Sequence, residues 1–233
     1  MYQESLGNHE PSSADDGSQQ TPFIASLGQA DSISNKLLML MPPTLHAFDL
    51  QSHKWQELRV SDISPVHWDD SLSYLALDDE MKNLLISSIE PIQSRRYREG
   101  DGQDLPASVI IHCHGRAESD KMFAAEAIAD YMKRPLYQLN AADFGTTAKQ
   151  AEVAINEAML FAASWQCVLL LDDVGFYLEP NSRKDIGRNA LASALMRLMD
   201  NFNGILVITT TDVDRMSVAF KSRIHLTLEF RPL

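Results

Sequence analysis

Gly115 and Lys121 are six residues apart, at a point where an apolar run gives way to an alanine-rich stretch. This spacing occurs in the phosphate-binding loop G-x-x-x-x-G-K-[ST], whose backbone N–H groups and lysine hold phosphate oxygens. Here Asp120 stands in place of the second glycine and Met122 in place of the Ser or Thr. The segment therefore predicts a nucleotide site, a damaged nucleotide site, or only a junction between a strand and a helix.

Two acids, Asp172 and Asp173, follow the apolar run Cys167–Leu171. An aspartate at the end of an aliphatic strand is typical of a Walker B motif, in which it holds Mg²⁺ directly or through water. The next position normally carries a glutamate that orients the attacking water. Asp173 is one methylene shorter, which withdraws its carboxylate by about 1.5 Å, and a misplacement of about 1 Å can cost roughly 100-fold in rate. The competing interpretation is a strand that ends in two solvated acids.

The elements that would position these residues alternate regularly along the chain. We expect strands at 109–114, 135–140, 167–171, 205–208 and 224–230, and helices at 121–133, 147–165, 186–200 and 214–221. Apolar strands that alternate with helices predict a parallel five-stranded sheet covered on both faces, which is a three-layer α/β/α fold. Ligands of such sheets bind beyond the carboxyl ends of the strands. Gly115, Asp172 and Thr211 each lie at the carboxyl end of a different expected strand.

The first part of the chain differs in composition from the rest. Residues 1–35 are rich in Ser, Gln and Asp with few apolar positions, so we expect a disordered acidic and polar tail. Residues 36–77 predict a small β-rich segment that contains a hairpin. The α/β core is expected over 78–233, and Pro91 is expected to kink or end its first helix.

Composition narrows the class of protein. Among 233 residues, 45% are hydrophobic and 22% are charged, as in an ordinary globular protein. The formal net charge of -12 argues against a general binder of nucleic acid or anionic membranes, because polyanions would be repelled. Cys113 and Cys167 lie in apolar runs without CxxC spacing, which suits a reducing compartment. With no signal peptide or membrane-length apolar run, we expect an intracellular protein, cytoplasmic or nuclear.

Region 105–231 resembles the core of an AAA+ ATPase, and motifs in matching order carry the resemblance. They are His114-Gly115, Lys121, Ala125–Ala129, Arg134–Tyr137, Asp143–Gly145, Trp165, Val168–Asp173, Arg188–Leu191, Gly204–Leu206, Thr209-Thr210 and Ala219–His225. The sequence resembles uncharacterised fungal AAA+ proteins, in which a segment like 36–77 precedes the core. The resemblance implies a P-loop NTPase fold with ATP and Mg²⁺ as cofactors.

The resemblance also implies roles for individual residues. The positions that match the phosphate loop of the family are Gly115, Ser119, Asp120, Lys121 and Met122. Lys121 would contact the β- and γ-phosphates, and Asp172 would support Mg²⁺. Asp173 would occupy the catalytic acid position, and Thr211 that of the polar sensor. Arg223 matches the arginine finger, which acts in a neighbouring subunit of a homo- or hetero-oligomeric ring.

The loop departs from the family pattern His-Gly-Pro-Pro-Gly-x-Gly-Lys-Thr. Glu118 and Asp120 replace glycines and place negative charge beside a polyanion. At about 4 Å and an effective dielectric constant near 20, each like-charge pair costs roughly 4 kcal/mol. Even a quarter of that energy would lower the affinity for phosphate about five-fold. Met122 offers no hard oxygen to Mg²⁺, and the helical lid of the family has no counterpart before Leu233.

Three functional hypotheses follow. The first is an AAA+ ATPase that binds and hydrolyses ATP to remodel proteins, weakened by its degenerate Walker A loop. The second is a pseudo-ATPase, an inactive interaction or regulatory subunit that docks into an AAA+ ring through Arg223 and Arg188. The third is a metal site, because His112 and His114 share one face of a strand and Glu118 or Asp172 could add an oxygen.

Overall fold

The computed structural model describes residues 41–95, 108–116, 120–145, 147–180, 186–212 and 214–230, and the predicted tail 1–35 lies outside these ranges. The chain divides into two compact units, Met1–Leu45 with Leu58–Asp62 and His46–Glu57 with Ile63–Leu233. Within the described ranges, none of the helices combines the length and the apolar content needed to cross a membrane.

The second unit is built on a sheet of five parallel strands in the order β4-β5-β6-β3-β7. In chain order these are β3 (Ser108–Gly115), β4 (Leu136–Asn140), β5 (Val168–Asp172), β6 (Gly204–Thr210) and β7 (Leu226–Phe230). The continuous apolar runs form the interior strands because both faces of a parallel sheet are buried. Leu169, Leu170 and Leu171 of β5, for example, are fully buried. The predicted parallel α/β fold is confirmed.

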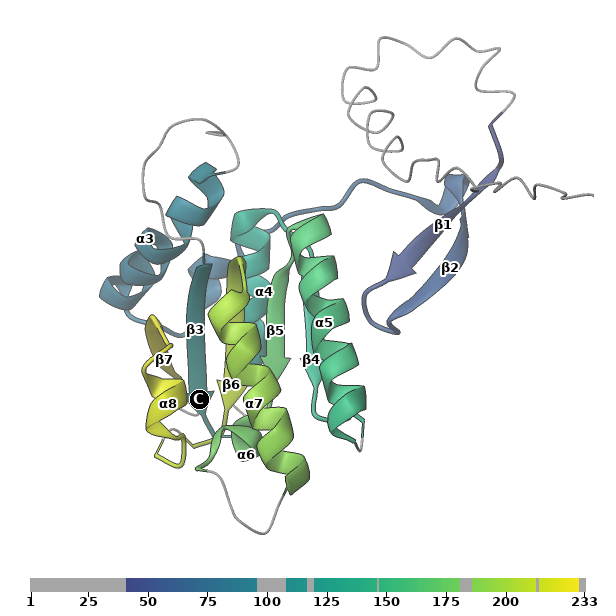
Figure 1. Ribbon diagram of the computed structural model, residues 1–233. Coiled ribbons are helices and arrows are strands. Elements are labelled where there is room, and N and C mark those ends of the chain that lie inside the picture. The colour runs from purple at the N-terminus through teal and green to yellow at the C-terminus, as the bar shows by residue number, and fades with distance from the viewer. Residues whose placement is uncertain are drawn as a thin grey trace, which may run out of the picture. The chain divides into compact units, whose positions relative to one another are not determined.

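Helices cover both faces of the sheet (Figure 1). One face packs against α3 (Asp79–Arg95) and α4 (Lys121–Met132), and the other against α5 (Ala148–Trp165), α6 (Gly175–Leu178), α7 (Ile186–Asn201) and α8 (Val218–Lys221). Side chains of β3 alternate between the two cores, with Ile111 on the α4 face and Ile110 on the α7 face. Cys113 and Cys167 are free thiols buried in these cores.

The strand order creates a topological switch point at the carboxyl edge of the sheet. The connection after β3 runs through α4 on one face to the edge strand β4, and the connection after β6 runs through α8 on the other face to β7. The adjacent strands β3 and β6 therefore send their connections to opposite faces of the sheet. Ligands of parallel sheets bind at the carboxyl ends of two strands that diverge in this way. His114 pairs with Thr210 at this end of the two strands.

Two local features differ in how well the sequence predicted them. The helix expected at 147–165 is α5, and a capping box of Thr147 and Gln150 starts it, in which each side chain satisfies an open backbone N–H. The first core helix, α3, does not end at Pro91 but continues to Arg95. Pro91 has no N–H to donate to the carbonyl oxygen of Ser87, and Ser87 is exposed to solvent.

A hairpin of β1 (Thr44–Asp49) and β2 (Lys54–Arg59) precedes the core. Its tip belongs to the second unit and contacts the edge strand β4 and helix α5. Phe48 packs on Phe161 with ring centroids 4.6 Å apart, and His53 Nε2 lies 2.9 Å from the carbonyl oxygen of Gln138. These contacts cover an edge of the sheet that would otherwise be open.

Candidate functional site

Lys121 is the first residue of α4 and is only 8% exposed. Its Nζ donates hydrogen bonds to the carbonyl oxygens of Gly115 and Arg116, each at 2.7 Å. Burial lowers the pKa of this amine, and the charges of Asp173 and Asp172 act in the opposite direction. Lys121 therefore lies within electrostatic reach of Asp172 and Asp173. The lysine precedes the two acids by about fifty positions in the chain.

Asp172 is held between side chains from the two strands that flank β5. Gln138 Nε2 of β4 donates to Oδ2 at 3.2 Å, and Thr209 Oγ1 of β6 donates to Oδ1 at 2.6 Å. These side chains lie on the face of the sheet that α4 covers. Leu170 and Val207, two positions before Asp172 and Thr209, belong to the core that contains α4. Both carboxylate oxygens are thus oriented, and each keeps a lone pair for water.

Asp173 follows with a left-handed backbone, at a φ of 50°. Its N–H donates to Thr209 Oγ1 at 2.8 Å, and the N–H of Val174 donates to the Thr209 carbonyl oxygen at 3.3 Å. Aspartate tolerates this conformation better than most residues. The turn at Asp173 is therefore hydrogen-bonded to Thr209 of β6, and this turn determines the direction of the exposed Asp173 side chain.

The loop itself is described in part. Ser119, like Glu118, lies outside the described residues. Asp120 is the N-cap residue of α4, but its side chain accepts no capping hydrogen bond there. Met122 is 43% exposed on the first turn of α4. The position that the loop motif gives to a Ser or Thr thus carries a solvent-facing thioether rather than an oxygen.

Thr211 and Arg223 lie apart from the contacts described above. Thr211 follows the last residue of β6 and is exposed. The Arg223 guanidinium pairs with Asp200 through Nε at 2.6 Å and Nη2 at 3.0 Å, and its Nη1 donates to the carbonyl oxygen of Ala219 at 2.7 Å. This pairing lowers the pKa of the Asp200 carboxyl. The structure thus brings together Lys121, Asp172 and Asp173, and engages Arg223 within its own chain.

The two histidines of β3 lie on the face opposite Asp172. His112 is fully buried, its Nε2 is 2.8 Å from Thr210 Oγ1, and its ring stacks on His114 with centroids 5.4 Å apart. In the part of the chain that the structure describes, His112 Nδ1 has no hydrogen-bond partner, and no three His, Cys, Asp or Glu side chains gather as metal ligands. The histidine metal-site hypothesis gains no support from this arrangement.

Sequence reasoning missed Gln138 and Thr209. Both are polar residues inside or at the end of apolar strands, which is a signal that can be read from the sequence. Their convergence on Asp172 depends on the strand order β4-β5-β6, which the local pattern does not contain. Thr209-Thr210 is among the motifs of the family resemblance, but only the phase of side-chain alternation assigns Thr209 to the α4 face.

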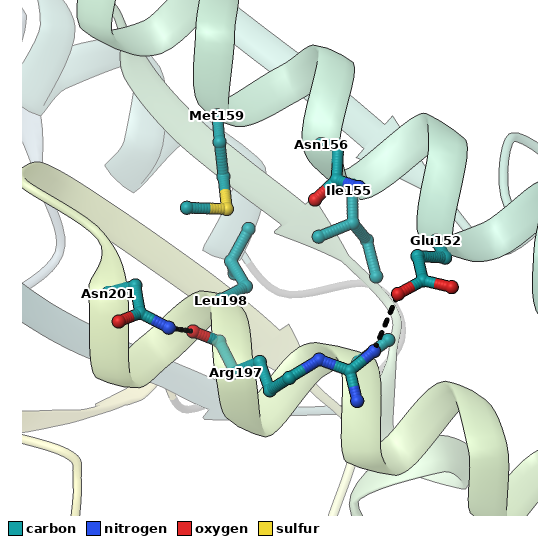
Figure 2. Close-up of a pocket in the computed structure, with 8 residues that line it drawn as sticks. Glu152, Ile155, Asn156, Met159, Arg197, Leu198 and Asn201 are labelled. Atoms are coloured by element: carbon teal, nitrogen blue, oxygen red, sulfur yellow. Dashed lines mark hydrogen bonds and ion pairs between the residues drawn. The ribbon is translucent and has the colours of Figure 1, made fainter.

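A groove of about 180 Å³ lies between α5 and α7 (Figure 2). Its lining residues are Glu152, Ile155, Asn156, Met159, Ala194, Arg197, Leu198 and Asn201. Arg197 Nη2 pairs with Glu152 across it at 3.1 Å. None of the predicted site residues in the described ranges lines this groove, so it is separate from the carboxyl edge of the sheet.

Comparison with known proteins gives one family. The family model described as ATPase family associated with various cellular activities (AAA) matches residues 112–232, just over half of the chain. The matched region begins within β3 and includes Lys121, Asp172, Thr209 and Arg223. No curated protein matches the sequence.

Proposed function

Because the chain belongs to the ATPase family associated with various cellular activities (AAA), we propose that it binds ATP with Mg²⁺ at the carboxyl edge of its sheet and hydrolyses it only weakly. The placement of two side chains at the carboxyl ends of two strands of one sheet carries this proposal: Lys121 Nζ bonds to the carbonyl oxygen of Gly115, the last residue of β3, and Asp172 is the last residue of β5. A lysine that follows one strand and an acid that follows another are the groups that hold a triphosphate and its metal ion.

The described residues fit a Mg²⁺-bound triphosphate in part. Lys121 supplies a buried ammonium group that could move from the two loop carbonyls to phosphate oxygens. Asp172 would hold Mg²⁺ through water, because Gln138 and Thr209 already occupy one lone pair on each of its oxygens. Met122, in place of the Ser or Thr that binds the ion directly, contributes no oxygen.

The remaining roles are proposed by family. Gly115, Ser119 and Asp120 would line the phosphate loop, and Asp173 and Thr211 would position the attacking water. Arg223 would act in the site of a neighbouring subunit within a homo- or hetero-oligomeric ring. In the isolated chain Arg223 is bound to Asp200, so the ring interaction has to displace or share that carboxylate.

Two features support weak rather than efficient catalysis. The acids of the loop repel phosphate, and even a quarter of the roughly 4 kcal/mol worked out for one pair lowers affinity about five-fold. The carboxylate of Asp173 is one methylene shorter than the glutamate that efficient enzymes use. Since misplacement by about 1 Å can cost roughly 100-fold in rate, turnover should fall more than binding.

The proposal is tested by titrating a fluorescent ATP analogue with Mg²⁺ into the full chain. We expect a Kd in the high micromolar range, and Lys121→Met should abolish binding. A sub-micromolar Kd would contradict the weakening of the loop. Binding that Lys121→Met leaves unchanged would place the nucleotide elsewhere.

A second titration uses the rebuilt loop, the triple variant Glu118→Gly, Asp120→Gly and Met122→Thr. It should tighten binding by removing two charges and restoring an oxygen ligand. Lys121→Met in the rebuilt loop is the matched control and should cancel the gain. If the rebuilt loop gains no affinity over the natural chain, the segment is not a phosphate site.

A second candidate function is that of an inactive subunit in an AAA+ assembly, for which Met122 and Asp173 are the supporting observations. Steady-state turnover of ATP separates the two candidates. Turnover above that of Asp172→Asn supports a weak ATPase, for which we propose by family that hydrolysis is coupled to protein remodelling. Binding without such turnover supports the inactive subunit.

A further inference from the structure

Thr209 connects the two acids of the site through one hydroxyl group. Its Oγ1 donates to Asp172 Oδ1 at 2.6 Å and accepts from the N–H of Asp173 at 2.8 Å. The direction of both bonds is fixed, because a backbone N–H only donates and an ionised carboxylate only accepts. The side chain that orients one acid therefore also fixes the backbone of the other.

The surroundings of Thr209 make this arrangement rigid. Thr209 is fully buried, and its backbone carbonyl oxygen accepts the N–H of Val174 at 3.3 Å. Three consecutive residues, Asp172 to Val174, are thus bonded to one residue of β6. A left-handed residue such as Asp173 persists where its surroundings hold it, and these bonds supply that restraint.

We propose that Thr209 is the positioning residue of this site, through which Asp172 is aimed at a hydrated Mg²⁺ and Asp173 is held in its left-handed turn. This inference rests on the proposed function, and it assigns to Thr209 a role distinct from that of Thr211. Thr211 lies beyond the end of β6 and is exposed, whereas Thr209 contacts both acids.

The chain offers a matched control in the next residue. Thr210 is as buried as Thr209, and its hydroxyl also makes one short side-chain hydrogen bond, to His112 at 2.8 Å. That bond lies on the opposite face of the sheet, where alternation directs the Thr210 side chain. Thr210→Val thus removes a buried hydroxyl from the same strand without changing either acid.

The first test measures how far Mg²⁺ tightens binding of the fluorescent ATP analogue, as the ratio of Kd in EDTA to Kd in Mg²⁺. Thr209→Val should reduce this ratio about tenfold, the value of a hydrogen bond to a charged group, and change Kd in EDTA less than about twofold. Thr209→Ser keeps the hydroxyl and should retain the ratio, as should Thr210→Val. Equal losses in Thr209→Val and Thr210→Val, or no loss in either, would overturn the assignment.

The second test needs no nucleotide. A double-mutant cycle of Thr209→Val and Asp172→Ala on the unfolding equilibrium should show a coupling of about tenfold. Coupling below about twofold would mean that Thr209 does not hold the carboxylate. If Mg²⁺ fails to tighten binding even in the natural chain, the proposed function fails, and the cycle alone then decides whether Thr209 positions Asp172.

Discussion

Replacing His112 with Phe should abolish about 3 kcal/mol of the folding stability that the natural chain loses on acidification. In the folded chain the pKa of His112 falls from 6.5 to about 4, first because of burial and then because of the charges of His114 and Lys221. The difference of about 2.5 pKa units corresponds to roughly 3 kcal/mol, at 1.36 kcal/mol per unit. This is a large part of the 5–15 kcal/mol that typically separates folded and unfolded states of a domain, as an order of magnitude.

The sign follows from proton binding. Between about pH 4 and 6.5 the unfolded chain binds a proton at His112 that the folded chain does not, so stability rises with pH across this window. The contribution is complete above pH 6.5 and is lost as the pH falls towards 4. In the folded state Nε2 bonds to Thr210, and a proton on Nδ1 would find no acceptor among the described residues.

Urea unfolding followed by circular dichroism from pH 4.5 to 7.5 measures this effect. At pH 7.5 the free energy of unfolding of His112→Phe should be about 1 kcal/mol below that of the natural chain, because the bond to Thr210 is missing. On acidification, the free energy of unfolding of the variant should fall much less than that of the natural chain. Lys221→Met keeps His112 while removing one charge that lowers its pKa, so its acid loss should be smaller but still present. Parallel pH profiles for the natural chain and His112→Phe would refute the reasoning, since His112 would then be partnered or already charged.

Three further predictions concern the site, the ring contact and the fold. Asp172→Asn should abolish the Mg²⁺ dependence of nucleotide binding while leaving binding in EDTA intact, and an unchanged dependence would remove Asp172 from the metal site. Asp200→Asn releases Arg223 and should increase self-association in size-exclusion chromatography with ATP, whereas Arg223→Ala should decrease it; equal elution of both variants would argue against a ring contact. Thr147→Ala should lower the free energy of unfolding by about 1 kcal/mol because it breaks the capping box of α5, and a wild-type urea midpoint would contradict that cap.

The fold could be predicted because the local hydrophobic pattern indicates each strand and helix. The apolar run predicted as a strand at 167–171 is β5, Val168–Asp172, and the expected helix at 147–165 is α5, Ala148–Trp165. Continuous burial of the strands required helices on both faces, and the structure has them. Of the two alternatives expected at Pro91, an end of α3 is wrong, because the helix continues to Arg95, whereas a kink stays a prediction.

The site could be predicted only at the strand ends. Lys121 and Asp172 each lie beside an apolar run, so their positions follow from the elements that contain them. The bonds of Asp172 to Gln138 and Thr209 span 34 and 37 positions along the chain. They exist because β5 lies between β4 and β6, an order set by the packing of the whole sheet rather than by any local pattern.

The position of Lys121 separates two causes of weak nucleotide binding. The acids of the loop repel phosphate, and the lysine is also bound to the carbonyl oxygens of Gly115 and Arg116. A phosphate gains the ammonium group only as those two bonds are given up, and one hydrogen bond to a charged group is worth about tenfold in affinity. The rebuilt loop removes the first cause and leaves the second, since both acceptors are backbone atoms. Its affinity should therefore rise and still fall short of a loop whose lysine is free, and a sub-micromolar Kd in the rebuilt loop would show that the carbonyl bonds cost nothing.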